Sequence, residues 1–156
     1  MKGNPKILET LNDLLADELT AISQYMVHAE MCEDWGYERL HKKTEERAFK
    51  EMKHAEALIA RIITLEGTPQ IDRLNPIHIG QDVPTQFAND LKSEQNALKM
   101  YNDAIRQADE LADAVTRNLL ESNARDEDAH IDWIEEQLDQ IEQMGAGIYL
   151  STQARE

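Results

Sequence analysis

Two stretches of this sequence, Glu51-Met52-Lys53-His54 and Glu127-Asp128-Ala129-His130, decide its fold, because each sets a carboxylate and an imidazole three residues apart. Residues at positions i and i+3 project from the same side of a helix, so each pair can hold one side of a metal cluster. A single Glu-x-x-His pair is weak evidence, since Glu38 and His41 form a third one in the same chain. The surroundings of each pair therefore decide which pairs are functional.

An internal repeat separates the first two pairs from the third. Its offset is 76 residues, and it relates three pairs of identical side chains: Glu18 with Glu94, Glu51 with Glu127, and His54 with His130. Tyr25 and Tyr101 follow the same offset, whereas positions 38 and 41 correspond to Ala114 and Arg117. Two helix pairs related by an approximate two-fold axis would place the six repeated residues symmetrically about one centre.

The four repeated glutamates lie within apolar stripes of helical spacing. Glu18 lies between Leu15 and Ile22, and the other three occupy similar positions in their own segments. Unpaired buried carboxylates are very costly, and four that face one another would repel and take up protons. Two divalent cations would balance the four charges. The six side chains match the ligand set of di-iron four-helix bundles, so we expect two iron ions between them; the alternative is six ordinary surface charges.

Glycine and proline divide the chain into long uninterrupted segments. Asn4 and Pro5 are typical of a helix start, and Gly36 predicts that this first helix ends near Trp35. The later expectations, in chain order, are a helix at 37–65, a long connection at 67–83, a helix beginning at 82–84, a turn at 111–113, a helix capped by Asp113 and ending at 144, and a short tail helix at 148–152. The pattern predicts an all-α fold, a four-helix bundle with a long crossover between helices 2 and 3 and a short C-terminal helix.

Composition limits the possible partners. The 156 residues fit one domain, 1–156, and 31 acidic against 16 basic residues give a formal net charge of −15. Such a surface repels nucleic acid and anionic lipid and attracts cations. No apolar stretch is long enough for a membrane helix, residues 1–5 lack the apolar region of a secretory signal, and Cys32 is the single cysteine. We therefore expect a cytoplasmic protein with no nucleic-acid or membrane partner.

Further motifs make the chain resemble bacterioferritin, the haem-containing branch of the ferritins, over essentially its whole length. They are Met1-Lys2-Gly3, Ser23-Gln24-Tyr25, Asp34-Trp35-Gly36, Glu51 to Ala55, Leu65-Glu66-Gly67, Ile79-Gly80, and Asp126-Glu127 with His130 to Trp133. The resemblance implies a ferritin-like fold and a hollow homo-oligomer of 24 subunits. Such a cage serves iron homeostasis by oxidising Fe(II) with O₂ or H₂O₂ as a ferroxidase and storing the mineral, and a small ferredoxin would be its reductant.

The resemblance also assigns roles to single residues. It implies that Glu18 and His54 hold one iron, that Glu94 and His130 hold the other, and that Glu51 and Glu127 bridge the two as part of the catalytic centre. Met52 would be the axial ligand of haem b at a two-fold subunit interface; it points about 100° away from Glu51 around the helix. Without the resemblance, Met52 would be read as packing material. The same ligands also accept Mn or Zn.

A few positions remain open. Tyr25 lies two turns after Glu18 on the same face, where it would hydrogen-bond a ligand, donate an electron, or simply pack in the core. Glu46 and Lys50 stand where several family members have an inward-facing His and Asp that are thought to assist iron transfer. Lys50 cannot bind iron while protonated, so this position departs from the family pattern.

Other functions are compatible with parts of the pattern. A di-iron peroxidase or oxygenase without storage would keep the six ligands, and a structural haem-binding helical bundle would need none of them. A rubrerythrin is disfavoured because the chain has no Cys-x-x-Cys tail. A DNA-coating mini-ferritin ranks low, because its metal site lies between subunits and the chain lacks a basic N-terminal arm.

Overall fold

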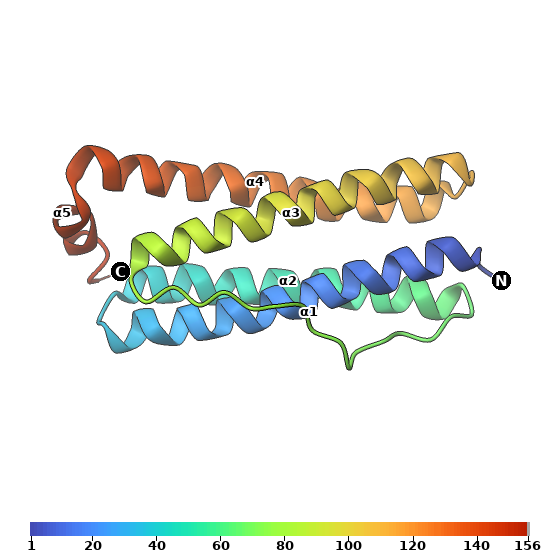
Figure 1. Ribbon diagram of the computed structural model, residues 1–156, viewed down its shortest axis with the longest axis horizontal. Helices are drawn as coiled ribbons and strands as arrows, with labels where there is room; N and C mark the ends of the chain where they lie inside the picture. The colour runs from blue at the N-terminus through green and yellow to red at the C-terminus, as the bar shows by residue number, and fades with distance from the viewer. Residues whose placement is uncertain (156) are drawn as a thin grey trace.

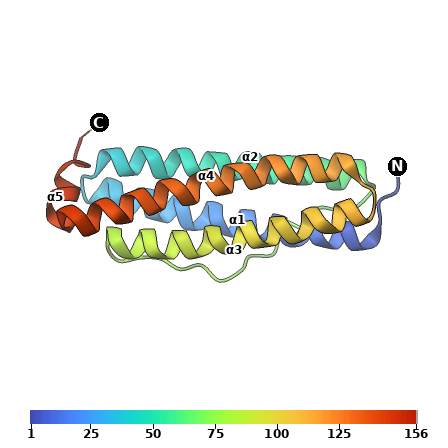
Figure 2. The same ribbon diagram turned by 90° about the horizontal axis from the view of Figure 1, so that it is seen from above.

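Four long helices form an antiparallel bundle in this computed structural model, which describes residues 1–155. They are α1 (Pro5–Asp34), α2 (Glu38–Thr64), α3 (Val83–Glu110) and α4 (Ala114–Met144), followed by the short α5 (Ala146–Ser151). Figure 1 shows α1 packed beside α2 and α3 beside α4, with α5 across one end. Figure 2 shows the same bundle from above. The predicted all-α bundle with a long crossover and a short tail helix is confirmed.

The helix ends follow from local hydrogen bonding. The side chain of Asn4 accepts a hydrogen bond from the Lys6 backbone N–H at 2.8 Å, and Gly36 takes a left-handed φ of 83° just after α1. The turn between α3 and α4 falls at 111–113 as expected, although a non-glycine residue, Ala112, adopts its φ of 57°. Asp113 caps α4 by accepting from the Thr116 backbone N–H at 3.1 Å.

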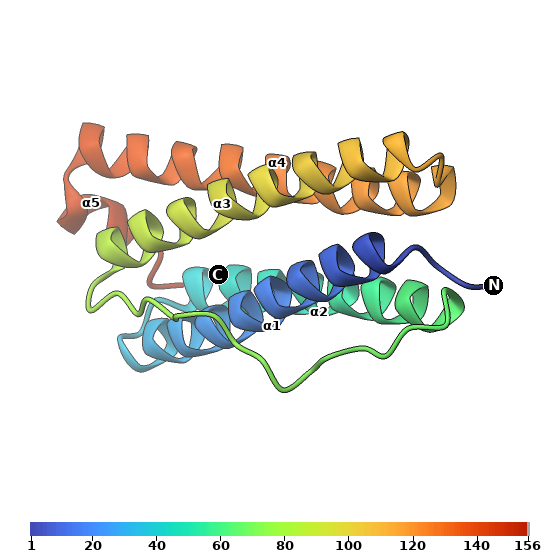
Figure 3. The same cartoon turned by 45° about the vertical axis from the view of Figure 1, so that its right-hand side comes forward.

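The connection between α2 and α3 crosses the length of the bundle along α1 (Figure 3). Three side chains of α1 each accept a hydrogen bond from a backbone N–H of this crossover: Thr20 from Asn75 (2.8 Å), Gln24 from His78 (3.1 Å) and His28 from Gly80 (3.0 Å). These bonds satisfy backbone groups that no helix or strand pairs. His28, to which the sequence assigned no role, therefore anchors the end of the crossover.

Two apolar clusters fill the two ends of the bundle. One surrounds Leu15, Leu58 and Leu120 at the end where α1 begins, and the other surrounds Phe87 and Tyr149 near α5. Tyr149 is fully buried and donates a hydrogen bond to Gln137 Oε1 at 2.7 Å. The tail helix thus packs on its own bundle, and it begins two residues earlier than expected. Among residues 1–155, no helix has the length and apolarity to cross a membrane.

Candidate metal centre

A layer of charged side chains crosses the bundle between the two apolar clusters. All six residues singled out by the repeat lie in it: Glu18 on α1, Glu51 and His54 on α2, Glu94 on α3, and Glu127 and His130 on α4. Each of the four glutamates is at most 2% exposed. The helices therefore bring together side chains that are up to 112 residues apart in the sequence.

Four of these residues converge most closely. Glu18, Glu51, His54 and Glu127 each offer one ligand atom, and these atoms lie within 4.8 Å of one another. His54 Nδ1 is 3.2 Å from Glu127 Oε1 and 3.5 Å from Glu18 Oε1. Within residues 1–155, the buried atoms Glu18 Oε2, His54 Nδ1 and Glu127 Oε1 have no hydrogen-bond partner. Buried polar atoms are normally paired. This oxygen and nitrogen donor set fits a divalent cation such as iron.

The other half of the layer contains Glu94 and His130, whose Oε1 and Nδ1 atoms are 3.4 Å apart. A residue that the sequence reasoning missed, Arg47, also enters this half. It is 7% exposed, and its guanidinium pairs with Glu51, with Glu127 at 2.9 Å and with Glu94 at 3.4 Å. Its position one turn before Glu51 on the same face of α2 is the signal that could have revealed it.

Two tyrosines hold the outer glutamates in a crosswise arrangement. The Tyr25 hydroxyl of α1 donates to Glu94 of α3, and the Tyr101 hydroxyl of α3 donates to Glu18 Oε1 of α1 at 2.6 Å. Both are buried, and burial followed by the nearby carboxylates raises the pKa of each well above its usual value. They stay protonated donors at neutral pH. Of the roles considered for Tyr25, hydrogen bonding to a candidate ligand is the one that the structure displays.

The histidine rings are oriented by different partners. His54 places Nε2 2.8 Å from Asp126 Oδ2, which leaves Nδ1 facing the glutamates. His130 instead stacks on Trp133, with ring centroids 5.7 Å apart and planes 9° apart, and meets the edge of Tyr25. The support from Asp126 was not predicted, although it lies directly beside Glu127 in the sequence.

Protons and Arg47 balance the acidic layer when it is free of metal. Burial and then the neighbouring Glu51 raise the pKa of Glu18. Burial alone would also raise the pKa of Glu51, but its close approach to Glu18 and His54 and the charge of Arg47 outweigh it and lower the pKa to about 2. Burial would lower the pKa of His54, but Glu18 and Glu51 raise it to about 10. Metal ions bound here would displace protons.

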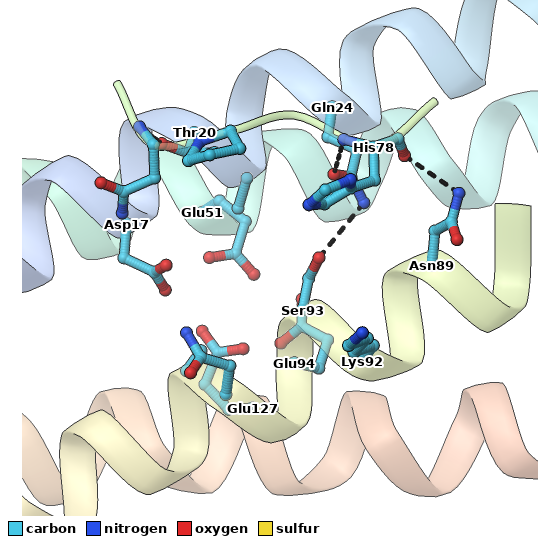
Figure 4. A pocket seen from close by; sticks show the side chains of 15 residues that line it. Asp17, Thr20, Gln24, Glu51, His78, Asn89, Lys92, Ser93, Glu94 and Glu127 are labelled. Atoms are coloured by element: carbon cyan, nitrogen blue, oxygen red, sulfur yellow. Dashed lines mark hydrogen bonds between the residues drawn. The ribbon is translucent and has the colours of Figure 1, made fainter. Parts of the chain in front are cut away.

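Two pockets flank the layer. The larger has a volume of about 430 Å³, lies between α1, α3 and the crossover, and reaches Glu51, Glu94 and Glu127. Figure 4 shows these three carboxylates facing into it, with Asp17 in its wall. Burial, Glu94 and Glu51 together raise the pKa of Asp17 to about 7. The second pocket, of about 390 Å³, lies on the side of Glu46, Lys50 and His130.

Two sequence features lie away from the layer. The third Glu-x-x-His pair, Glu38 and His41, lies outside the layer. His41 Nε2 is 2.7 Å from Glu33, and its Nδ1 is 2.8 Å from the Ala29 carbonyl. Met52 is 38% exposed while its neighbour Glu51 is buried, so the two residues do face different surroundings.

Comparisons with known proteins agree with this architecture. Residues 8–144 match the ferritin-like domain. Bacterioferritin of Rhodobacter capsulatus is 43% identical over 145 residues, covering 93% of this chain and 90% of that protein. Bacterioferritin of Brucella melitensis is 43% identical over 149 residues (96% and 92%), and that of Streptomyces coelicolor is 40% identical over 152 residues (97% and 91%). With the buried Glu and His cluster, these relatives support a role in iron storage. The chain belongs to the bacterioferritin family.

Proposed function

We propose that this protein is a ferroxidase that takes up Fe(II), oxidises it between the four helices and stores the Fe(III) product. The observation that carries the proposal is the layer of four buried carboxylates and two imidazoles, several of whose donor atoms have no hydrogen-bond partner. In the metal-free protein, protons and Arg47 compensate these buried charges, and bound divalent cations would take over that role.

Each half of the layer has its own part in this proposal. Glu18 and His54 hold one Fe(II) substrate ion, Glu94 and His130 hold the other, and Glu51 and Glu127 lie between them as bridges. Tyr25 and Tyr101 keep the two outer carboxylates in place through their hydrogen bonds. The residues thereby hold a two-iron substrate pair rather than two separate ions.

The pairing determines the chemistry. Two Fe(II) ions supply two electrons and become two Fe(III) ions, and O₂ takes up those electrons with two protons to give H₂O₂. H₂O₂ accepts two electrons and two protons to give two water molecules. Because both electrons come from one site, no one-electron oxygen radical is released.

The surroundings suit a cation as substrate. The 430 Å³ pocket gives a route from the surface past Asp17 to the bridging glutamates, and the net charge of −15 attracts Fe(II) toward the protein. The second pocket, beside Glu46 and Lys50, offers a route on the other side for the oxidised product.

The larger assembly is part of the same proposal. The chain acts as one ferritin-like di-iron domain, and 24 copies enclose the mineral in a cytoplasmic cage. Met52 would bind the iron of haem b at a two-fold subunit interface, and its exposure of 38% and the family membership support this assignment. A small ferredoxin supplies electrons for iron release.

A single substitution tests the ferroxidase. Glu127→Gln keeps the shape of a bridging side chain and removes its charge. We expect initial Fe(II) oxidation by O₂ to slow by roughly 100-fold or more, because substituting a residue that only hydrogen-bonds to a metal ligand already costs about 10- to 100-fold in activity. Glu38→Gln is the control, because Glu38 belongs to the Glu-x-x-His pair outside the layer. Stopped-flow oxidation is measured on particles whose mass confirms assembly. Unchanged kinetics in assembled Glu127→Gln particles would contradict the proposal.

A further inference from the structure

The repeat that relates the two halves of the metal layer breaks at one buried position. Arg47 on α2 corresponds to Asn123 on α4 at the offset of 76 residues. Asn123 is neutral, and its Nδ2 donates to the Tyr101 hydroxyl at 3.2 Å. Arg47 contacts the carboxylates directly. One half of the layer therefore contains a permanent positive charge that the other half lacks.

The contacts of Arg47 place this charge among the two central carboxylates and Glu94, and no ion pair within residues 1–155 joins it to Glu18. Its guanidinium pairs with Glu94 and with both central residues, Glu51 and Glu127. A guanidinium does not lose its proton in proteins, so it repels any nearby metal ion at every working pH. The half that contains Glu18 and His54 has the closely convergent group of four ligand atoms, and that group does not include Glu94 or His130.

The surroundings of Arg47 include an open space beside its side chain. Its Nε atom is buried and has no hydrogen-bond partner in the described part of the chain, so the carboxylates make most of the polar contacts of the side chain. A backbone carbonyl, that of Asp126, accepts one further bond at 3.4 Å. The 390 Å³ pocket lies directly beside Arg47 and His130, and the carboxylate of Glu46 in its wall offers a new partner.

We propose that Arg47 is a built-in cation that occupies the second metal position of the metal-free protein, so that the two ions bind in order and with unequal affinity. The first ion binds between Glu18, Glu51, His54 and Glu127. The second binds at Glu94 and His130 only after the guanidinium has moved into the neighbouring pocket. This inference rests on the proposed function, since it assumes that the layer binds divalent cations.

Calorimetric titration of the metal-free protein with Zn²⁺, which is redox-inert, tests the proposal. We expect wild type to bind one ion per chain, with a second at least about tenfold weaker because of the guanidinium charge. Arg47→Asn, which installs the residue found at position 123, should bring the second affinity to within about threefold of the first. Lys53→Gln removes one exposed charge from the same helix, outside that pocket and paired within residues 1–155 only with Glu56, so it should change neither affinity.

The outcomes separate the inference from the proposed function. Two equal affinities in wild type, or an Arg47→Asn variant whose second affinity does not rise, would overturn the role of Arg47 while leaving a metal-binding layer. If Zn²⁺ does not bind at the six residues at all, the proposed function is overturned instead.

A second measurement needs no variant and covers the case in which Arg47→Asn does not fold. Crystal structures of the wild-type protein with one and with two equivalents of Co²⁺ per chain should show the guanidinium in the layer in the first case and in the 390 Å³ pocket in the second. Two bound ions with Arg47 still paired to Glu94 would refute the proposal.

Discussion

Lys50 on α2 and Asp126 on α4 occupy equivalent positions in the two halves of the bundle, yet they carry opposite charges and lie 3.8 Å apart (Nζ to Oδ1). Asp126 Oδ2 lies 2.8 Å from His54 Nε2 and accepts a hydrogen bond from it when that nitrogen is protonated. The ammonium group of Lys50 has only donors, so it offers His130 no such acceptor. A carboxylate behind an imidazole sets its tautomer and raises its basicity as a ligand. The two histidines are therefore unequal even though the repeat makes them look alike.

Asp126→Asn should weaken metal binding in the half that contains His54. The amide keeps the size of the side chain but removes the negative charge behind the ring, so we expect the first Zn²⁺ affinity to fall by about 10- to 100-fold. Calorimetric titration of the metal-free protein measures it. Asp128→Asn, two residues along the same helix and exposed, is the matched control. An equal loss in both variants would show that general surface charge, and not the Asp126 contact, sets the affinity.

The sequence predicted the six candidate ligands because the repeat preserves their side chains, but it did not predict the residues around them. Arg47 and Asp126 lie where the repeat breaks, opposite Asn123 and Lys50, so symmetry gave no indication of their roles. That the six bind metal remains a prediction. The structure adds which of their neighbours are charged and where those charges lie.

Two features of the fold likewise differ in whether the sequence predicted them. The turn at 111–113 was predicted mainly from helix length, because no glycine or proline marks it; the residue that adopts its left-handed conformation is Ala112. The path of the crossover was not predictable, because it depends on hydrogen bonds to side chains of α1 such as Gln24 and His28. Those contacts link segments 52 or more residues apart, and no local pattern records them.

Met52→Leu should abolish haem binding and spare the metal layer. Leucine keeps an apolar surface of similar size but has no thioether to bind haem iron. The assembled protein is reconstituted with haem b, and the haem absorption band and the Zn²⁺ stoichiometry are measured together. Met26→Leu is the control, because Met26 is another exposed methionine, at 57%. A Met52→Leu particle that retains the full haem band would exclude Met52 as the ligand.

Asp113→Asn should make the protein less stable at neutral pH but not in acid. Partial burial alone would raise the pKa of Asp113, but hydrogen bonds from Thr116 and the Arg61 guanidinium outweigh it and lower the pKa below the usual 3.8. A carboxyl with a lowered folded-state pKa stabilises the fold above its unfolded-state pKa, and this contribution is lost as the pH falls through the folded-state value.

The expected size is modest because asparagine still caps the helix. We expect a loss of about 0.3–1 kcal/mol near neutral pH, from the missing charge at the start of α4. The difference from wild type should shrink as the pH falls below 3.8, the usual pKa of an aspartate side chain. Thermal unfolding at a series of pH values measures it, with Asp139→Asn as an exposed control on α4. A difference that stays constant into acid would rule out the charge as its source.

Gly80→Ala should destabilise the junction between the crossover and α3. A Cβ atom at position 80 would lie 2.3 Å from the Gln86 backbone nitrogen and 2.6 Å from its Cα. These atoms belong to the first turn of α3, so relief requires moving either that turn or the crossover. The second option would also break the bond from Gly80 N–H to His28. We expect a loss of about 1–3 kcal/mol, as for other overpacked sites.

The matched control for Gly80→Ala is another glycine in open space. Gly147 lies in α5, and a Cβ there would meet no atom within 4 Å. Because alanine favours a helix over glycine, Gly147→Ala should be neutral or stabilising by up to about 1 kcal/mol. Thermal unfolding of both assembled variants gives the comparison. Equal unfolding midpoints for the two variants would mean that the crossover shifts at Gly80 at little cost in stability. Its contacts with α1 would then contribute little to fixing the wall of the pocket beside Asp17.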